Sequence, residues 1–240
     1  MAAPVIETHG LSKIYGNAPM IREPVLREID FRLLPGHGAF VIGGNGAGKS
    51  TLISILAGLC APSAGVALVF GQDTRSLAAR YRKRIGMMTH QSMLYPNLSA
   101  RENLEFYAAL YALPDPAAAA AGWLERVGLE AVADVRVRAF SRGMEQRLAA
   151  ARAMIAEPAL LLLDEPFAAL DAESAAMVAG LIRAAVMRGA TAMLTAHAAA
   201  EIEGVSFDLF ELSSGRLLPA KEETFKEETR RGRLRSLLGR

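Results

Sequence analysis

The sequence predicts an α/β fold with a mainly parallel core sheet, a β-rich beginning and an inserted helical segment. Short apolar runs alternate with stretches of helical length, an alternation typical of parallel βαβ units. Residues 76–157 interrupt it, because their pattern is mostly helical. The 240 residues are enough for one large domain, or for a domain with an inserted lobe.

The first elements are expected to be strands. Residues 5–8 and 25–33 have strand composition, and glycine, asparagine and proline between them mark turns. Residues 39–42 form a short apolar run, which predicts a buried strand. Residues 50–57 have an apolar face at helical spacing, so a helix is expected after a tight loop.

The loop between that strand and that helix has a recognisable pattern. Residues 43–50 read Gly-Gly-Asn-Gly-Ala-Gly-Lys-Ser and fit G-x-x-x-x-G-K-[ST], the phosphate-cradling loop. Glycines let successive backbone N–H groups converge on an anion without Cβ clashes. Lys49 would reach the β- and γ-phosphates, and the Ser50 hydroxyl would ligate Mg²⁺. The positive end of the following helix dipole favours the same anion.

The later elements restore the alternation. A turn is expected at residues 61–65 and a strand at 66–70. The alanines at 117–121 follow Pro116, a suitable first helical residue, and predict a helix. Strands are then expected at 160–163, 190–195 and 207–212, with helices at 172–188 and 198–203.

Two acids end the apolar strand expected at 160–163. At the carboxyl end of a strand beside a phosphate loop, Asp164 would hold Mg²⁺ through water. Glu165 would accept a proton from the attacking water, because hydrolysis needs a positioned acceptor near the γ-phosphate. The alternative is an N-cap pair for the next helix.

Three further side chains each have a chemical and a structural interpretation. His197 follows a predicted strand and would donate a hydrogen bond to the γ-phosphate, although a lone histidine is often structural. Gln91 follows an apolar stretch and would ligate Mg²⁺ or orient water. Tyr15 would stack on a base or simply pack against its neighbours.

Residues 140–147, Phe-Ser-Arg-Gly-Met-Glu-Gln-Arg, also have two interpretations. Ser141 is a suitable N-cap for an amphipathic helix through residue 156. The Ser141 hydroxyl and the N–H groups around Gly143 would also bind phosphate at that helix terminus. A second phosphate site in a chain with one phosphate loop is explained by a two-fold dimer, in which each chain completes the other's nucleotide site.

Together these motifs resemble the nucleotide-binding subunit of ATP-binding cassette (ABC) transporters over residues 5–218. The resemblance implies a P-loop NTPase fold with an antiparallel β subdomain, ATP and Mg²⁺ as cofactors, and ATP hydrolysis. It implies catalytic roles for Lys49, Gln91, Glu165 and His197, and magnesium ligation by Ser50, Gln91 and Asp164. The ATP-contacting residues that it implies within one chain are Tyr15, Gly43, Gly44, Asn45, Gly46, Ala47, Gly48, Lys49, Ser50 and Thr51, with Ser141, Gly143 and Asp171 contributed by the partner chain.

The signature segment departs from the family pattern Leu-Ser-Gly-Gly-Gln. Phe140, Arg142 and Met144 replace its leucine, first glycine and glutamine, while Ser141 and Gly143 are kept. This variant is similar to exporters of the ABC-2 type. Residues 95–107, 135–143 and 164–167 are similar to the haem-exporter ATPase of cytochrome c maturation, which implies haem export for cytochrome c biogenesis. Export of a lipid, polysaccharide or drug is the alternative, and a non-transport ABC ATPase is a further one.

The resemblance also implies the organisation and the partners. An ATPase domain is expected over residues 1–218, with the helical subdomain inserted at about 76–157, and a charged tail over 219–240. The expected partners are a second ATPase subunit, identical or different, and separate transmembrane permease subunits. The expected location is the cytoplasmic face of the inner or plasma membrane.

Composition restricts the function classes. The net charge of +2 does not favour nucleic acid as a partner, and the single cysteine allows no internal disulfide. The N-terminus lacks the features of a signal peptide, and no apolar run approaches the ~18–20 residues of a membrane span. The chain is therefore expected to be soluble or peripheral.

The sequence contains no Asn-Lys-x-Asp motif, with which GTPases recognise the guanine base, so a GTPase is not expected.

Overall fold

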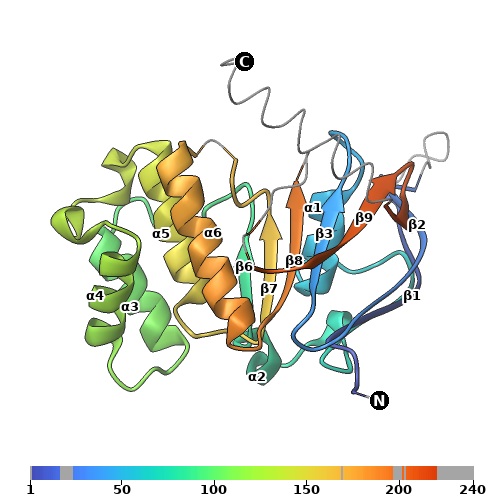
Figure 1. Cartoon of the computed structure of the whole chain (residues 1–240). Coiled ribbons are helices and arrows are strands. Elements are labelled where there is room, and N and C mark those ends of the chain that lie inside the picture. Colours follow the sequence, from blue (N-terminus) through green and yellow to red (C-terminus); the bar gives the residue numbers. More distant parts are fainter. Residues whose placement is uncertain (1, 17–23, 169, 197–201, 203, 221–240) are drawn as a thin grey trace.

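A computed structural model describes residues 2–16, 24–168, 170–196, 202 and 204–220 (Figure 1). The described strands form two sheets, one of six strands and one of four. His197, most of the helix expected at 198–203, and the charged tail from residue 221 on lie outside the described residues.

The six-stranded sheet is the parallel core that the sequence predicts. Its order is β10-β9-β3-β8-β7-β6, and every neighbouring pair is parallel except β10 with β9. The strands are β3 (Gly38–Ile42), β6 (Ile85–Met88), β7 (Leu160–Asp164), β8 (Thr191–Ala196), β9 (Phe207–Ser213) and β10 (Arg216–Pro219). The carboxyl ends of the parallel strands therefore meet at one edge, the upper edge in Figure 1.

The β-rich beginning forms the antiparallel sheet, in the order β2-β1-β4-β5. Its strands are β1 (Ile6–Lys13), β2 (Leu26–Leu33), β4 (Ala64–Val69) and the short β5 (Gln72–Asp73). β2 alternates buried and exposed residues over most of its length, as expected when one face packs on the core and the other meets solvent. Figure 1 places this sheet beside β9 and β3, at the opposite end of the core sheet from the inserted helices.

The inserted helices gather beyond the β6 edge of the core sheet (Figure 1). They are α3 (Ala100–Leu110), α4 (Pro116–Arg126), which starts at the expected proline, and α5 (Arg142–Met154). A short α2 (Ala79–Arg82) precedes β6. Helices α1 (Lys49–Leu56) and α6 (Ala172–Met187) confirm the helices expected at 50–57 and 172–188.

The mostly helical interpretation of residues 76–157 is wrong at β6. This strand pairs in parallel with β7 from Ile85↔Leu160 to Met88↔Leu163, and it is buried throughout. Four apolar residues are too few for periodicity to distinguish a strand from a buried helical turn. Pairing with β7, which is distant in the sequence, makes this segment a strand.

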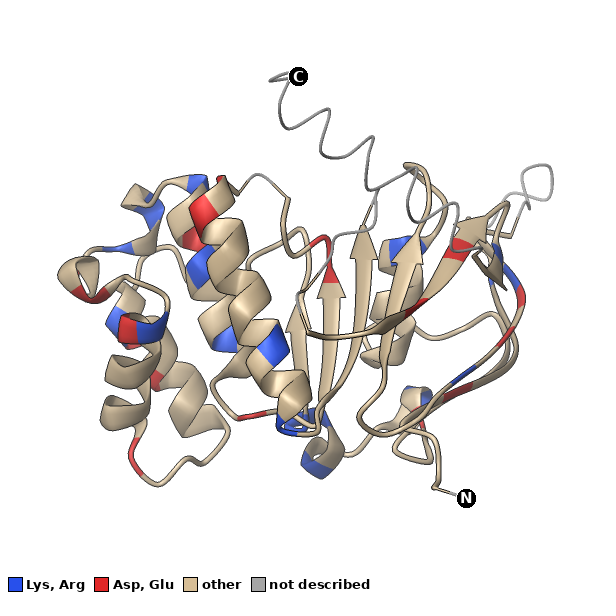
Figure 2. Ribbon diagram, in the orientation of Figure 1, with Lys and Arg blue, Asp and Glu red and all other residues tan. Residues whose placement is uncertain are grey.

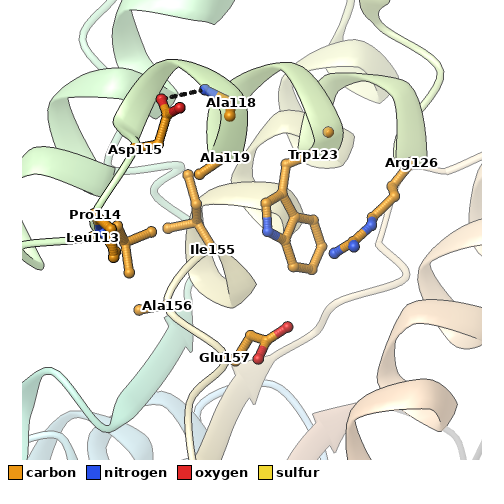
Figure 3. A pocket seen from close by; sticks show the side chains of 11 residues that line it. Leu113, Pro114, Asp115, Ala118, Ala119, Trp123, Arg126, Ile155, Ala156 and Glu157 are labelled. Atoms are coloured by element: carbon orange, nitrogen blue, oxygen red, sulfur yellow. Dashed lines mark hydrogen bonds between the residues drawn. The ribbon is translucent and has the colours of Figure 1, made fainter.

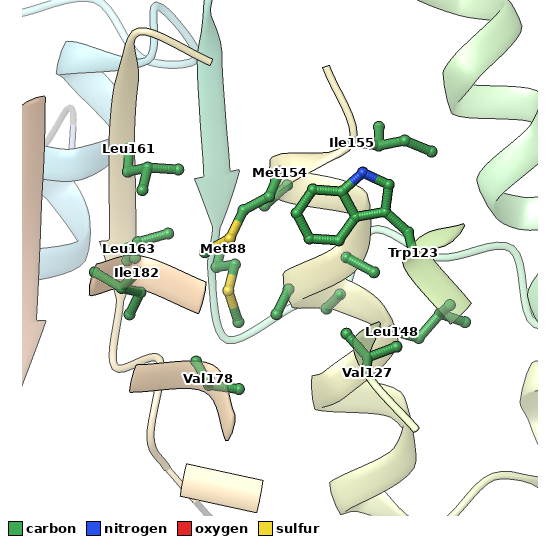
Figure 4. Close-up of a cluster of buried hydrophobic side chains, with 14 of the residues drawn as sticks. Met88, Trp123, Val127, Leu148, Met154, Ile155, Leu161, Leu163, Val178 and Ile182 are labelled. Carbon is green, nitrogen blue, oxygen red and sulfur yellow. The ribbon is translucent and has the colours of Figure 1, made fainter. Parts of the chain in front are cut away.

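Strands β3, β6, β7 and β8 of the core sheet are buried on both faces, which explains their continuous apolar runs. Leu160 and Leu162 of β7 belong to one hydrophobic cluster, with the buried face of α1. Leu161 and Leu163 belong to the other cluster, with α5 and α6. Figure 4 shows this second cluster, in which Met154 of α5 and Trp123 of α4 lie beside Met88 at the end of β6.

Charged residues of both signs are distributed over the surface, and the strands of the core sheet carry few of them (Figure 2). The upper end of β7 is an exception, because acidic residues are drawn there. Among the residues that the structure describes, no helix has the length and apolar character needed to cross a membrane.

Candidate nucleotide site

The glycine-rich loop connects β3 to α1, as the motif requires. Gly46 and Gly48 have φ angles of 77° and 106°, in the region where only glycine is unstrained. A Cβ on Gly48 would lie 2.9 Å from the Val25 carbonyl oxygen. A Cβ on Gly43 would lie 2.4 Å from the Leu212 carbonyl oxygen, so close backbone approach also requires glycine there. The loop conformation is therefore fixed by these glycines and by the strands behind them.

Lys49 is the first residue of α1, directly after this loop. Its side chain is buried, and its ammonium donates hydrogen bonds to the carbonyl oxygens of Gly43 at 2.7 Å and Gly44 at 3.1 Å. The same Nζ lies 3.8 Å from Oε1 of Glu165. The loop therefore holds one positive charge next to the acid that follows β7, so two predicted catalytic residues lie side by side.

The two acids after β7 have different environments. Asp164 is 3% exposed, and the Thr195 hydroxyl donates to its Oδ1 at 2.5 Å. Glu165 has a positive φ of 52°, and its backbone N–H donates to the Thr195 carbonyl at 3.0 Å. The alternative in which these acids cap the next helix is wrong, because Asp171 caps α6 by accepting from the Ser174 N–H at 2.8 Å.

Thr195 is a site residue that sequence reasoning missed. It is fully buried near the end of β8 and contacts both acids, 31 and 30 residues away in the sequence. The only local signal is a hydroxyl near the end of an otherwise apolar strand. The residues around Thr195 do not show that β7 will pair with β8, so the contacts of Thr195 with the two acids could not be predicted from the sequence.

A cavity of about 260 Å³ collects the predicted residues around the loop. Tyr15 forms part of its wall and is 52% exposed, and its stacking on a base stays a prediction. Its hydroxyl lies 3.4 Å from the Thr51 Oγ1, and the Lys13 ammonium lies 4.9 Å from the ring centroid. The cavity is lined by Tyr15, Val25, Asn45, Gly46, Ala47, Gly48, Lys49, Ser50, Thr51 and Glu165.

Gln91 does not line this cavity. It is exposed in the loop after β6, and its backbone N–H donates to the Thr89 hydroxyl at 3.2 Å. Ser141 and Gly143 lie at the start of α5 and do not line it either. The Ser141 hydroxyl accepts from the Met144 N–H at 3.3 Å, which confirms the N-cap interpretation. The phosphate interpretation of this terminus stays a prediction.

Asp171 has a pKa below its usual range, first because of the hydrogen bond from the Ser174 backbone N–H to its carboxylate. It is therefore an anion at neutral pH at the N-terminus of α6. Ala169, within the same segment, lies outside the described residues.

The donors for magnesium suit an ion that is bound together with phosphates. Mg²⁺ prefers oxygen ligands and usually keeps several waters beside one or two carboxylates. The exposed Ser50 hydroxyl and the buried Asp164 carboxylate are donors of this kind. Within the described part of the chain, no three His, Cys, Asp or Glu residues gather into a metal cage of their own.

A second cavity, of about 340 Å³, lies between α4 and the segment after α5 (Figure 3). Trp123 and Arg126 line it from α4, and the guanidinium carbon of Arg126 lies 4.9 Å from the Trp123 ring centroid. Glu157 lines the opposite wall. No residue of the predicted nucleotide site lines this cavity.

Comparison with known proteins gives consistent matches. The family model described as ABC transporter matches residues 26–168. The chain is 32% identical over 90% of its length to Nod factor export ATP-binding protein I of Ralstonia nicotianae, and covers 66% of that protein. It is 35% identical over 88% of its length to the protein of the same name from Rhizobium etli, again covering 66%. A linearmycin resistance ATP-binding protein of Bacillus subtilis is 32% identical over 83% of the chain, which covers 63% of it.

This chain spans about two thirds of the length of these relatives. Among solved structures, the dimeric structure of a bacterial ABC transporter cassette has a TM-score of 0.80 and 23% identity, with 90% of this chain and 99% of that chain covered. An ATP-binding subunit of an ABC transporter has a TM-score of 0.79 and 27% identity, with 94% and 99% covered. The fold is therefore shared over nearly the whole of those chains.

Proposed function

The chain belongs to the ABC transporter family, and from this premise we propose that it is the ATP-binding and ATP-hydrolysing subunit of a membrane exporter. The observation that carries the proposal is the cavity where Lys49 and Glu165 meet. A buried ammonium in a glycine loop, 3.8 Å from an acid at a strand end, suits the β- and γ-phosphates of a nucleotide and the attacking water.

Each residue then has a role that follows from its chemistry. Lys49 neutralises phosphate charge as the transition state forms. Glu165 accepts the proton of the attacking water, and its 32% exposed side chain leaves it accessible to water. Tyr15 stacks on adenine with its exposed ring. Ser50 and Asp164 would hold Mg²⁺, which would neutralise charge on the phosphates. Gln91 and His197 complete the γ-phosphate environment, as the family resemblance implies.

The site is completed by a second chain in this proposal. Ser141 and Gly143 lie at the N-terminus of α5, which has no phosphate loop of its own. A two-fold arrangement lets this terminus bind the γ-phosphate held by the partner's loop, with Asp171 nearby. Closing the dimer around two ATP molecules then drives transport through separate permease subunits, at the cytoplasmic face of the membrane.

The cargo class rests on the relatives' names and on the sequence resemblance. The two kinds of relatives named above are an ATP-binding protein for Nod factor export and one for linearmycin resistance. These names support an exporter and do not support cytochrome c biogenesis. Haem export rests only on the resemblance of residues 95–107, 135–143 and 164–167 to the haem-exporter ATPase. Export of a lipid, polysaccharide or drug is therefore the favoured alternative.

The proposed activity is tested by phosphate release from ATP by the purified chain. The expected result is Mg²⁺-dependent hydrolysis that Glu165→Gln lowers by ~10² or more. Isolation of the native complex from membranes tests the rest, because an exporter subunit co-purifies with a membrane permease. Co-purification with ribosomes or DNA instead would favour a non-transport ATPase.

The segment from Gln91 to Asn103 is the proposed permease contact. Tyr95 is 46% exposed and packs edge-on against Phe106, with ring centroids 5.0 Å apart. The Asn103 side chain fixes the backbone of Tyr95, accepting from its N–H at 2.8 Å and donating to its carbonyl at 3.0 Å. The aromatic pair is therefore held in place at the surface, as an interface anchor requires.

Tyr95→Asp tests this contact. The variant should retain ATP binding by the isolated chain but lose permease assembly or coupling, because a charge replaces an apolar anchor. Met187→Asp is the matched control, since Met187 is 72% exposed at the end of α6. Normal assembly and transport by Tyr95→Asp would remove this segment from the interface.

A further inference from the structure

The loop that carries Gln91 is tied to the first turn of α5. The Ser92 hydroxyl, next to Gln91, donates to Oε1 of Glu145 at 2.5 Å. The two residues are 53 positions apart in the sequence, and the contact is partly buried. A hydrogen bond to a carboxylate is among the stronger kinds, and limited solvent access preserves it. Glu145 lies four residues after Ser141, in the turn proposed to bind the partner's nucleotide.

The ends of the same loop are held by α3 and α5. The Tyr107 hydroxyl of α3 donates to the Met93 carbonyl at 2.5 Å. On the other side of Gln91, the buried Arg152 of α5 donates to the Met87 carbonyl of β6, the outer strand of the sheet. The Arg152 guanidinium carbon also lies 5.5 Å from the Tyr107 ring centroid. Arg152 of α5 therefore contacts the backbone before Gln91 directly, and through the Tyr107 ring it contacts the residue that holds the backbone after Gln91.

The first turn of α5 also reaches the loop after β7. The Gln146 side-chain amide donates to the Pro166 carbonyl at 3.4 Å, one residue beyond Glu165. One helical turn thus contacts both loops that carry proposed catalytic groups. Neither Ser92 nor Glu145 lines the nucleotide cavity itself.

We infer that Glu145 and Ser92 are positioning residues, whose hydrogen bond sets the place of Gln91 when the N-terminus of α5 engages the partner's nucleotide. The inference rests on the proposed function and names the intrachain link between the two nucleotide sites of the dimer. Binding of phosphate at Ser141 and Gly143 fixes the first turn of α5. Glu145 then holds Ser92, and Gln91 beside it, in the position that hydrolysis requires.

A double-mutant cycle on the full-length chain tests this link by steady-state ATP hydrolysis. Ser92→Ala removes the donor without changing charge. Glu145→Ala removes the acceptor but also an anion near a proposed phosphate site, so the cycle is needed to isolate the bond. Ser92→Thr restores a hydroxyl. Asp134→Asn is the matched control, because it weakens an exposed ion pair with Arg101 elsewhere among the inserted helices.

Each single variant should lower kcat about tenfold with KM for ATP unchanged, since binding occurs at the phosphate loop. The double variant should show the same loss of about tenfold, and not the product of two losses. Ser92→Thr should recover most of the kcat, and Asp134→Asn should match the wild type. Circular dichroism should be the same for all variants, and the small fall in thermal midpoint from the lost bond should not follow the loss of kcat.

Multiplying losses, an unchanged kcat in Ser92→Ala, or failure of the threonine to recover activity would overturn the inference. A lower thermal midpoint that tracks the activity would also overturn it, because the bond would then be merely structural. A wild-type chain without ATPase activity would instead refute the proposed function, so the two failures are distinguishable.

Discussion

At the scale of single residues, the site is a balance of charges at two strand ends. Lys49 is buried, yet it keeps its ammonium between two loop carbonyls and close to Glu165. Burial of a charge is costly unless it is hydrogen-bonded, and the loop carbonyls provide those bonds. The Thr195 hydroxyl likewise donates a hydrogen bond to the buried Asp164 carboxylate and orients it. The chemistry is therefore pre-arranged by neighbours that do not themselves react.

Lys49→Ala and Glu165→Gln should fail differently. Lys49 contacts phosphate in both ground and transition states, so its loss should weaken ATP binding as well as turnover. Glu165→Gln keeps the shape but removes the proton acceptor, so binding should survive while turnover falls by ~10² or more. Nucleotide binding and phosphate release are measured on both variants. Equal loss of binding in the two would reject these role assignments.

At the scale of elements, the inserted helices are defined by their caps. The Ser99 hydroxyl accepts from the Glu102 N–H at 3.1 Å, and the Glu102 carboxylate accepts from the Ser99 N–H at 2.7 Å. This reciprocal pair starts α3 within the segment proposed to contact the permease. The cap thereby pairs two backbone N–H groups that the helix itself leaves without acceptors.

Ser99→Ala should lower the free energy of unfolding by about 1 kcal/mol, the usual effect of losing a serine N-cap. Chemical denaturation with a fluorescence or circular dichroism readout measures this. Ser76→Ala is the matched control, because Ser76 is exposed and its loss should change the free energy by less than about 0.5 kcal/mol. Equal stability of the two variants would show that the cap contributes nothing measurable.

At the scale of the whole molecule, the phosphate loop and the N-terminus of α5 lie on different parts of the chain. The loop lies at the carboxyl edge of the core sheet, whereas α5 starts among the inserted helices (Figure 1). Among the described residues, a Cβ added at Gly143 would meet no atom within 4 Å. A side chain can therefore be added at this position without a clash inside the described part of the chain, which gives a sharp test of the proposed dimer.

Glu165→Gln should form a dimer with ATP and Mg²⁺, because hydrolysis no longer releases the trapped nucleotide. Adding Gly143→Asp should abolish that dimer, since a carboxylate would then face the partner's γ-phosphate. Gly180→Asp on the Glu165→Gln background is the matched control, because a Cβ at Gly180 also meets no atom within 4 Å. Sedimentation velocity measures all three. A monomer for Glu165→Gln alone at saturating ATP would contradict the two-fold arrangement.

The sequence by itself determined the fold class, the glycine loop and most helix starts. Each of those features depends on a few consecutive residues. Examples are the glycine that allows a positive φ at Gly48, the proline at the start of α4, and the N-cap of α5 at Ser141. These features can be predicted from sequence because each depends on interactions between residues that are close together in the chain.

The tertiary structure alone decided which distant residues meet. Ile85–Met88 becomes a strand because it pairs with β7, although its surroundings in the sequence are helical. Thr195 meets Asp164, and Ser92 meets Glu145, across 31 and 53 residues. Strand order and helix packing create these contacts, and no short window of sequence specifies either. The candidate site was therefore predictable where a motif marks its residues, including the acids after β7, and not at Thr195 or Ser92, which no motif marks.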